Sequence, residues 1–191
     1  MYFRCYNNIS VKKITPILNI LTTTFFCTVL AITCSAQPYG KGVYNSNIPY
    51  GNLTSLSIGT SGNIDIPITP TSDGVLATGN STITVTSTDI TGYKLYIRSL
   101  NSTSMNNLGA QLPTSNNVTP APLAIDTWGY NTDASIDFIG INLTDTLIRS
   151  TNSPVPNGEA TNVTYGINLD MAKPAGNYTA TVVYTAVPQT D

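Results

Sequence analysis

Residues 160–187 read ATNVTYGINLDMAKPAGNYTATVVYTAV, and their pattern decides the fold class. Apolar and polar side chains alternate along both halves, with the period of two of a half-buried β-strand. Between the halves, Pro174 fixes φ at a bend and Gly176 accepts a positive φ. The stretch therefore predicts two long strands joined as a hairpin, with their apolar rows buried together. These rows are Val163, Tyr165, Ile167 and Leu169 in the first strand and Tyr178, Ala180, Val182, Tyr184 and Ala186 in the second.

Two similar pairs of segments precede this stretch. Leu53 to Ile58 and Asn63 to Ile68 flank a Gly-Thr-Ser-Gly turn, and Pro67 predicts an edge strand because it lacks an amide donor. Ser81 to Thr86 and Tyr93 to Ser99 alternate cleanly on either side of a turn that ends in glycine. Both pairs are predicted to be hairpins.

The rest of the chain suits loops and short strands. Asn101 to Pro122 is polar and interrupted by prolines, so we expect an irregular excursion of the kind used for binding or left disordered. Ile136 to Leu147 is apolar enough for one or two short strands. Short strands separated by turn signals, without a helical period, predict an all-β fold. We expect one antiparallel β-sandwich of Ig-like or Greek-key type over residues 53–188.

The N-terminal 36 residues have the order of a secretory signal peptide. Basic residues, including Lys12 and Lys13, precede the apolar run Ile14 to Ala36, which ends in small residues that suit signal peptidase. We therefore expect cleavage before Gln37. A retained membrane anchor is the alternative, but threonines dilute the run, and a span needs about 20 apolar residues.

Cysteine usage and the segment after the leader fit the same interpretation. Cys5, Cys27 and Cys34 all lie in the leader, so the cleaved chain could form no disulfide. Gln37 to Asn52 has Pro-Tyr-Gly motifs but no sustained period, which predicts a flexible N-terminal arm. Together these features predict a secreted bacterial protein, stabilised by packing alone.

The composition argues against several functional classes. Charged residues make up only 9% of the chain, and no basic patch could follow a phosphate backbone, so nucleic acid is not an expected partner. The chain has no histidine, and cleavage would remove every cysteine, which excludes the common nucleophile systems and zinc sites. The spacing of the aspartates selects no pair of catalytic carboxylates. We expect neither an enzyme nor a cofactor or metal.

Three aromatic residues are candidate ligand-binding positions. Trp128 and Tyr130 lie two apart, hence on one face of a strand, and could form a platform for sugar rings. The favoured alternative is that both belong to the core, since tryptophan is rarely left exposed in a domain with few large side chains. Tyr96 lies opposite the apolar row of its strand and is the better candidate for exposure.

Three segments occur in a suggestive order: Val85 to Leu95, Trp128-Gly129-Tyr130, and Tyr165 to Val182. Together they resemble secreted β-sandwich modules of bacterial surface proteins with unassigned function. Tyr178 to Thr185 also resembles the C-terminal hairpin of WxL-type cell-wall-binding domains, with Tyr184 where those domains have tryptophan and no clear Trp-x-Leu upstream. The resemblance implies display at the cell surface, with cell-wall or surface polysaccharide or other surface proteins as partners.

These observations give one leading functional hypothesis and one alternative. The first is a non-enzymatic, structural or adhesive module, secreted or held at the cell surface, that self-associates through edge strands. The second is a carbohydrate-binding module that uses the exposed aromatic residues.

Overall fold

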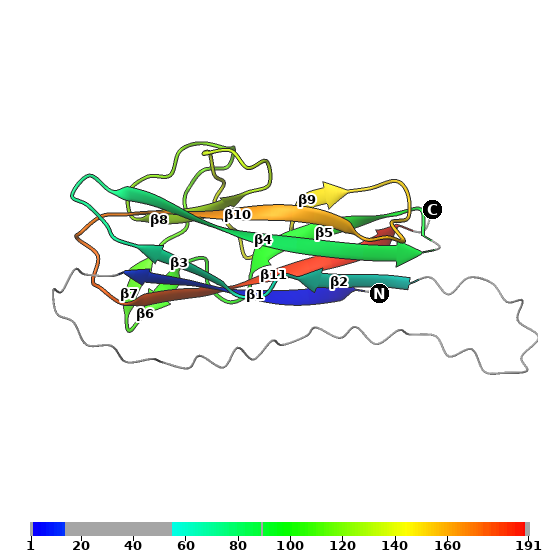
Figure 1. Ribbon diagram of the computed structural model, residues 1–191, viewed down its shortest axis with the longest axis horizontal. Helices are drawn as coiled ribbons and strands as arrows, with labels where there is room; N and C mark the ends of the chain where they lie inside the picture. Colours follow the sequence, from blue (N-terminus) through cyan, green and yellow to red (C-terminus); the bar gives the residue numbers. More distant parts are fainter. Residues whose placement is uncertain (1, 14–54, 89, 190–191) are drawn as a thin grey trace, which may run out of the picture.

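The computed structural model describes residues 2–13, 55–88 and 90–189, and these form a two-layer β-sandwich (Figure 1). The described residues form eleven strands and no helix, so the predicted all-β sandwich is confirmed. They accordingly include no helix that could cross a membrane. The strands are β1 (Phe3–Lys13), β2 (Ser55–Thr60), β3 (Ile64–Ile68), β4 (Val75–Thr88), β5 (Gly92–Ser99), β6 (Met105–Asn107), β7 (Ala110–Leu112), β8 (Thr127–Asn131), β9 (Thr146–Ser150), β10 (Glu159–Leu169) and β11 (Asn177–Gln189).

The larger sheet has the order β3-β1-β11-β5-β9, with β6 also paired to β11 and β7 paired to β6. The smaller sheet has the order β2-β4-β10-β8. Neighbouring strands are antiparallel, except that β1 runs parallel to β3. The predicted edge position of Pro67 is confirmed, because β3 ends the larger sheet.

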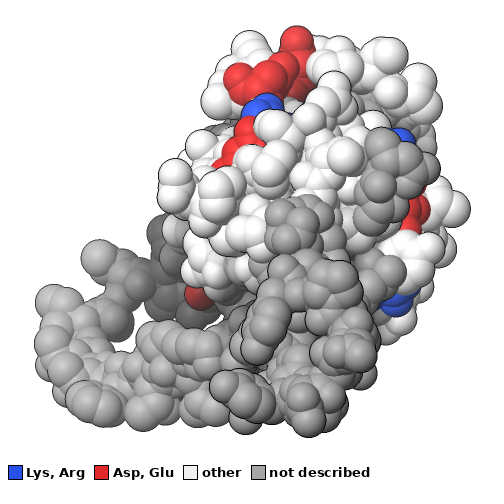
Figure 2. Space-filling model, turned by 90° about the vertical axis from the view of Figure 1, so that its right-hand side faces the viewer, with Lys and Arg blue, Asp and Glu red and all other residues white. Residues whose placement is uncertain are grey.

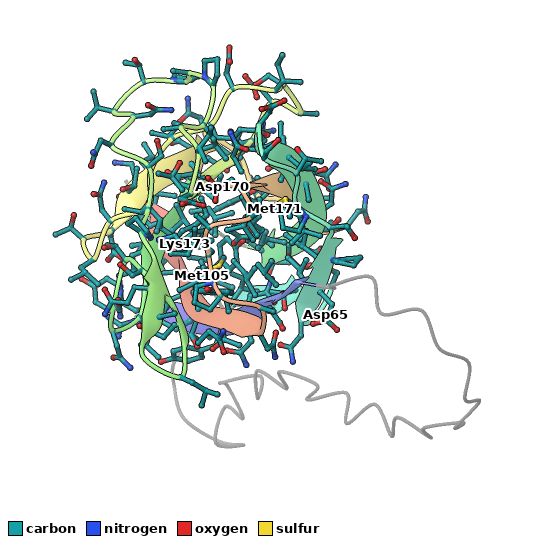
Figure 3. All side chains as sticks on the ribbon, turned by 90° about the vertical axis from the view of Figure 1, so that its left-hand side faces the viewer. Asp65, Met105, Asp170, Met171 and Lys173 are labelled. Atoms are coloured by element: carbon teal, nitrogen blue, oxygen red, sulfur yellow. The ribbon has the colours of Figure 1, made fainter. Side chains whose placement is uncertain are left out.

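None of the three predicted hairpins forms, although every predicted strand in them exists. In each pair, β2 with β3, β4 with β5, and β10 with β11, the two strands lie in opposite sheets. The turns between them are therefore arches that cross the sandwich. Figure 3 looks onto one of these arches, the β10–β11 connection that carries Asp170, Met171 and Lys173. Two apolar rows are buried equally well when they face each other across the sandwich and when they lie side by side in one sheet. Alternation alone therefore does not determine which strand is the hydrogen-bonded partner.

The two apolar rows of residues 160–187 do bury together, but across the core. The hydroxyl groups of Tyr165 in β10 and Tyr184 in β11 share a hydrogen bond between the sheets. On the outer face of β11, Val183 is also fully buried, between Tyr6 and Arg98 of the flanking strands. At this position β11 is thus buried on both faces, whereas its sequence predicts burial of one face only.

The larger sheet also contains residues from the predicted leader. Strand β1 lies between β3 and β11, so the sandwich includes a segment outside residues 53–188. The apolar run Ile14 to Ala36, the expected cleavage site and the arm Gln37 to Asn52 lie outside the described residues. The core-facing residues of β1 are Cys5, Asn7, Ile9 and Val11, all of them buried.

The two segments predicted to be loops or short strands contain few regular elements. Residues 101–122 include the short β6–β7 hairpin, which the sequence analysis missed. Within residues 136–147, Phe138 and Ile139 form only isolated bridges, and β9 begins at Thr146.

Candidate interaction surface

Trp128 is a core residue. Its side chain is 0% exposed, and its indole Nε1 donates a 2.9 Å hydrogen bond to the carbonyl oxygen of Thr103. The ring centroid lies 6.5 Å from that of Tyr165, at a tilt of 34°. Neither ring face is available to a sugar, so Trp128 occupies the core position that the sequence analysis favoured.

Tyr130 and Tyr96 do not complete an aromatic platform. Tyr130 is 2% exposed, and burial raises the pKa of its hydroxyl. Tyr96 is half-buried and lies on β5, in the sheet opposite to β8, which carries Trp128 and Tyr130. The structure therefore does not bring the three candidates together.

A group of polar side chains lies inside the sandwich, where the sequence analysis expected only packing. The amide Nδ2 of Asn7 donates a 2.8 Å hydrogen bond to Oγ of Ser81. Ser81 also interacts with the hydroxyl of Tyr184, which is bonded to Tyr165. Burial raises the pKa of both tyrosines above the ordinary value. The four side chains come from β1, β4, β10 and β11, and all four are buried, so they link the two sheets through the core.

A charge cluster joins β5 and β9 of the larger sheet to β10 of the smaller sheet. The hydroxyl of Tyr93 donates a 2.6 Å hydrogen bond to Oε2 of Glu159, and Arg149 forms an ion pair with Oε1. The hydrogen bond from Tyr93, followed by the Arg149 contact, lowers the pKa of the Glu159 carboxyl. The carboxylate is thus held as an anion by two donors, an arrangement suited to joining β5 and β9 to β10 rather than to proton transfer. No cluster of three metal-binding side chains occurs among the described residues.

Residues 113–145, apart from β8 itself, pack on the outer face of β8 and β10 in the smaller sheet, and we call this segment the loop pad. Gly166 of β10 pairs with Gly129 of β8, and the ring of Phe138 packs directly on Gly166. The amide Nδ2 of Asn117 donates to the carbonyl oxygens of Ala121, Pro122 and Phe138 at 3.0–3.2 Å. The loop pad is therefore fastened both to the sheet and to itself.

Several large apolar side chains project from these fastened loops into solvent. Val118 is 90% exposed and Ile136 is 76% exposed, and Ile125 and Leu143 are about half exposed. Leu108, at the tip of the β6–β7 hairpin, is completely exposed with φ at 43°. Sequence reasoning missed them because an apolar residue in a loop has no periodic signal, and scattered exposed apolar residues are common.

The loop pad carries four aspartates, Asp126, Asp133, Asp137 and Asp145, and no lysine or arginine. Figure 2 shows one end of the molecule, where most side chains are uncharged and several acidic side chains gather beside a basic one. A partner would therefore meet exposed apolar side chains among hydroxyl, amide and carboxylate groups.

Three of the edge strands, β8, β3 and β9, offer little free backbone for association. Loop-pad residues bridge to the outer side of β8, including paired hydrogen bonds between Tyr130 and Ile139. Pro67 interrupts the donors of β3, and β9 has five residues and a register irregularity at its pairing with β5. Short strands, proline and covering loops are the usual protection against edge pairing.

No family model, curated protein or solved structure matches this chain.

Proposed function

We propose that this chain is a non-enzymatic module, exported to the cell surface or the medium, that serves as a structural or adhesive subunit. The order of the N-terminal residues supports export. The observation that carries the adhesive role is the loop pad, which presents Val118 and Ile136 to water from a fastened scaffold. Exposed apolar side chains that lie together mark protein-binding surfaces, and these two residues belong to one ordered segment.

The resemblance to bacterial surface modules supports the same proposal, with other surface proteins or wall polymers as partners. Burial of these apolar side chains on a partner would supply affinity. The buried tyrosines and the paired Glu159 have structural roles in this proposal.

The experiment compares binding to intact cells and to cell-wall fractions by sedimentation. A Val118→Ser, Ile136→Asn variant should lose most of the bound fraction, because it removes apolar area without touching the buried residues of the loop pad. Leu76→Asn is the matched control, since Leu76 is 43% exposed on β4. Equal binding by the double variant, or a wild-type chain that stays monomeric and binds neither fraction, contradicts the proposal.

A carbohydrate-binding role remains the alternative, and of the three aromatic candidates it now depends on Tyr96. That ring is half-buried, whereas Trp128 and Tyr130 are covered. A glycan array separates the two proposals: glycan binding that Tyr96→Ala abolishes supports the alternative. Tryptophan emission should be blue-shifted and unchanged by any bound sugar, because Trp128 is fully buried.

A further inference from the structure

Strand β1 (Phe3–Lys13) lies within the predicted leader, residues 1–36. Cleavage before Gln37 would remove Phe3–Lys13 completely, and with it a strand that pairs with β11 over ten positions and with β3 over five. The exported chain of the proposed function would then contain β3 and β11 without the strand that lies between them.

Loss of β1 would leave a slot with the shape of one strand. Its walls, β3 and β11, would be separated by two strand spacings, about 9–10 Å. Both walls would present unpaired backbone groups, and the buried volume of Ile9 and Val11 would be empty. Ser81 would also lose the hydrogen bond from Asn7. Another extended segment has to enter this slot for the sandwich to keep its core.

We propose that the slot between β3 and β11 is a strand-binding site, filled in the exported chain by the N-terminal arm of a second copy. The inference rests on the proposed export and cleavage. It also names the partner: another copy of this chain, bound by β-strand addition.

The arm has a sequence suited to this place. Val43-Tyr44-Asn45 matches Cys5-Tyr6-Asn7 of β1, with an apolar residue and an asparagine at the two inward positions. Asn47-Ile48 then matches Asn8-Ile9 after one additional residue, Ser46. One inserted residue is what a β-bulge accommodates. In this register Asn45 takes the place of Asn7 beside Ser81, and Ile48 takes the place of Ile9.

Chain length decides between the arm of the same copy and that of a second copy. Ile64 lies beside Ile9, and β2 and β3 run one after the other in the direction of β1 (Figure 1). Ser55 precedes Ile64 by nine positions, so it lies roughly 30 Å upstream of Ile9. If Ile48 takes the place of Ile9, seven residues of chain lead from it to Ser55. Fully extended, they span at most about 25 Å, which is less than the distance that has to be covered. The arm of the same copy cannot reach, whereas the arm of a second copy has no such restriction.

An interface of this kind joins two different surfaces, the arm of one copy and the slot of the next. Such a head-to-tail contact builds a ring when its rotation closes and an open chain when it does not. It differs from pairing at the sheet edges, where Pro67 interrupts β3 and loop-pad residues cover β8.

The test uses the full chain expressed with its leader in a bacterial host. Intact mass gives the N-terminus of the exported protein, and light scattering after size exclusion gives its assembly state. We expect an N-terminus at Gln37 and particles of at least twice the mass of one chain. Ile48→Asp should give monomers, and the matched arm variant Ser46→Asp should still assemble.

A competition experiment covers the case in which Ile48→Asp fails to fold. A synthetic peptide of residues 3–13, added as the exported chain refolds, should bind and convert the assemblies to monomers, whereas the same peptide with Ile9→Asp should not. An exported chain that starts at Gln37 yet stays monomeric, or assemblies that neither Ile48→Asp nor the peptide affects, would overturn the inference and leave export standing. A recovered protein that keeps Met1 would overturn the cleavage on which the inference rests.

Discussion

The side-chain amide of Asn7 donates a 2.8 Å hydrogen bond to the hydroxyl oxygen of Ser81, which lies 74 positions later and in the opposite sheet. Both residues are buried, so this bond fastens β1 to β4 through the core. The first strand is thus held by the core as well as by its neighbours β3 and β11. A buried amide also resists replacement, because the group that it leaves behind needs a new partner.

The Asn7 bond can be tested in the full-length chain expressed without export. Asn7→Ala leaves the Ser81 hydroxyl without this donor and opens a small gap, so the free energy of unfolding should fall by about 1–3 kcal/mol. Urea denaturation measures the change. Arg4→Ala is the control, because Arg4 is exposed on the same strand and should change stability by no more than about 0.5 kcal/mol. An Asn7→Ala protein as stable as the control would show that this bond does not stabilise the attachment of β1.

The turn between β6 and β7 holds a leucine in an unfavourable conformation. Leu108 has φ at 43° and Gly109 has φ at 96°, the two positive values of a type I′ hairpin turn. Asparagine tolerates this region better than leucine, so Leu108→Asn should raise the free energy of unfolding by roughly 1 kcal/mol. Thermal denaturation checks the change, with Leu108→Ala as the control, because alanine keeps the backbone strain. If binding to cells falls as stability rises, the exposed leucine has a contact role.

The attachment of the loop pad depends on a glycine without a side chain. A Cβ atom on Gly166 would lie 2.5 Å from the ring of Phe138, closer than such contacts allow. Gly166→Ala should therefore lower the free energy of unfolding by about 1–3 kcal/mol and loosen the loop pad, as seen by faster proteolysis within residues 113–145. Gly59→Ala is the matched control, since nothing lies within 4 Å of its added Cβ. Equal stability of both variants would mean that Phe138 is not seated on the sheet.

The buried tyrosine pair predicts a loss of stability in alkali. Burial raises the pKa of Tyr165 and Tyr184 in the folded chain, so both stay neutral where unfolded tyrosine, with an ordinary pKa of 10.0, ionises. The contribution of the two tyrosines to the free energy of unfolding is complete below about pH 10. It is lost as the pH rises from there toward their pKa values in the folded chain. The free energy of unfolding in urea should therefore begin to fall near pH 10 and fall more steeply about one pH unit higher.

A double variant isolates the contribution of this pair. Tyr165→Phe, Tyr184→Phe removes both hydroxyls at once, which leaves neither one buried without a partner and should be nearly neutral at pH 8. The double variant should show a shallower alkaline decline, with some dependence kept by Tyr93 and Tyr130, whose pKa values are also raised. A decline as steep as in the wild-type chain would exclude the pair as its source.

The candidate surface could be predicted only in part from the sequence. Because Trp128 and Tyr130 are two residues apart, the sequence predicts that they share one face of a strand. Only the packing of the two sheets shows that this face points into the core. Tyr96 was correctly separated from the apolar row of its strand, yet neighbouring side chains leave it half-buried. Val118, Ile136 and Leu108 gave no signal, because a loop residue has no period to place it inside or outside.

Alternation along residues 160–187 was sufficient to locate two strands, their inward rows and the fold class, because the period of two belongs to each strand alone. Which strands pair with each other was decided only by the tertiary structure. Backbone N–H and C=O groups can form the same hydrogen bonds with any neighbouring strand, so they do not select a partner. All three predicted hairpins thus became arches between the sheets. The place of Phe3–Lys13 in the larger sheet could likewise not be predicted from the sequence. The order of its basic and apolar residues predicts a leader. Its inward residues, Cys-x-Asn-x-Ile-x-Val, instead pack between β3 and β11, and that position exists only in the assembled sheet.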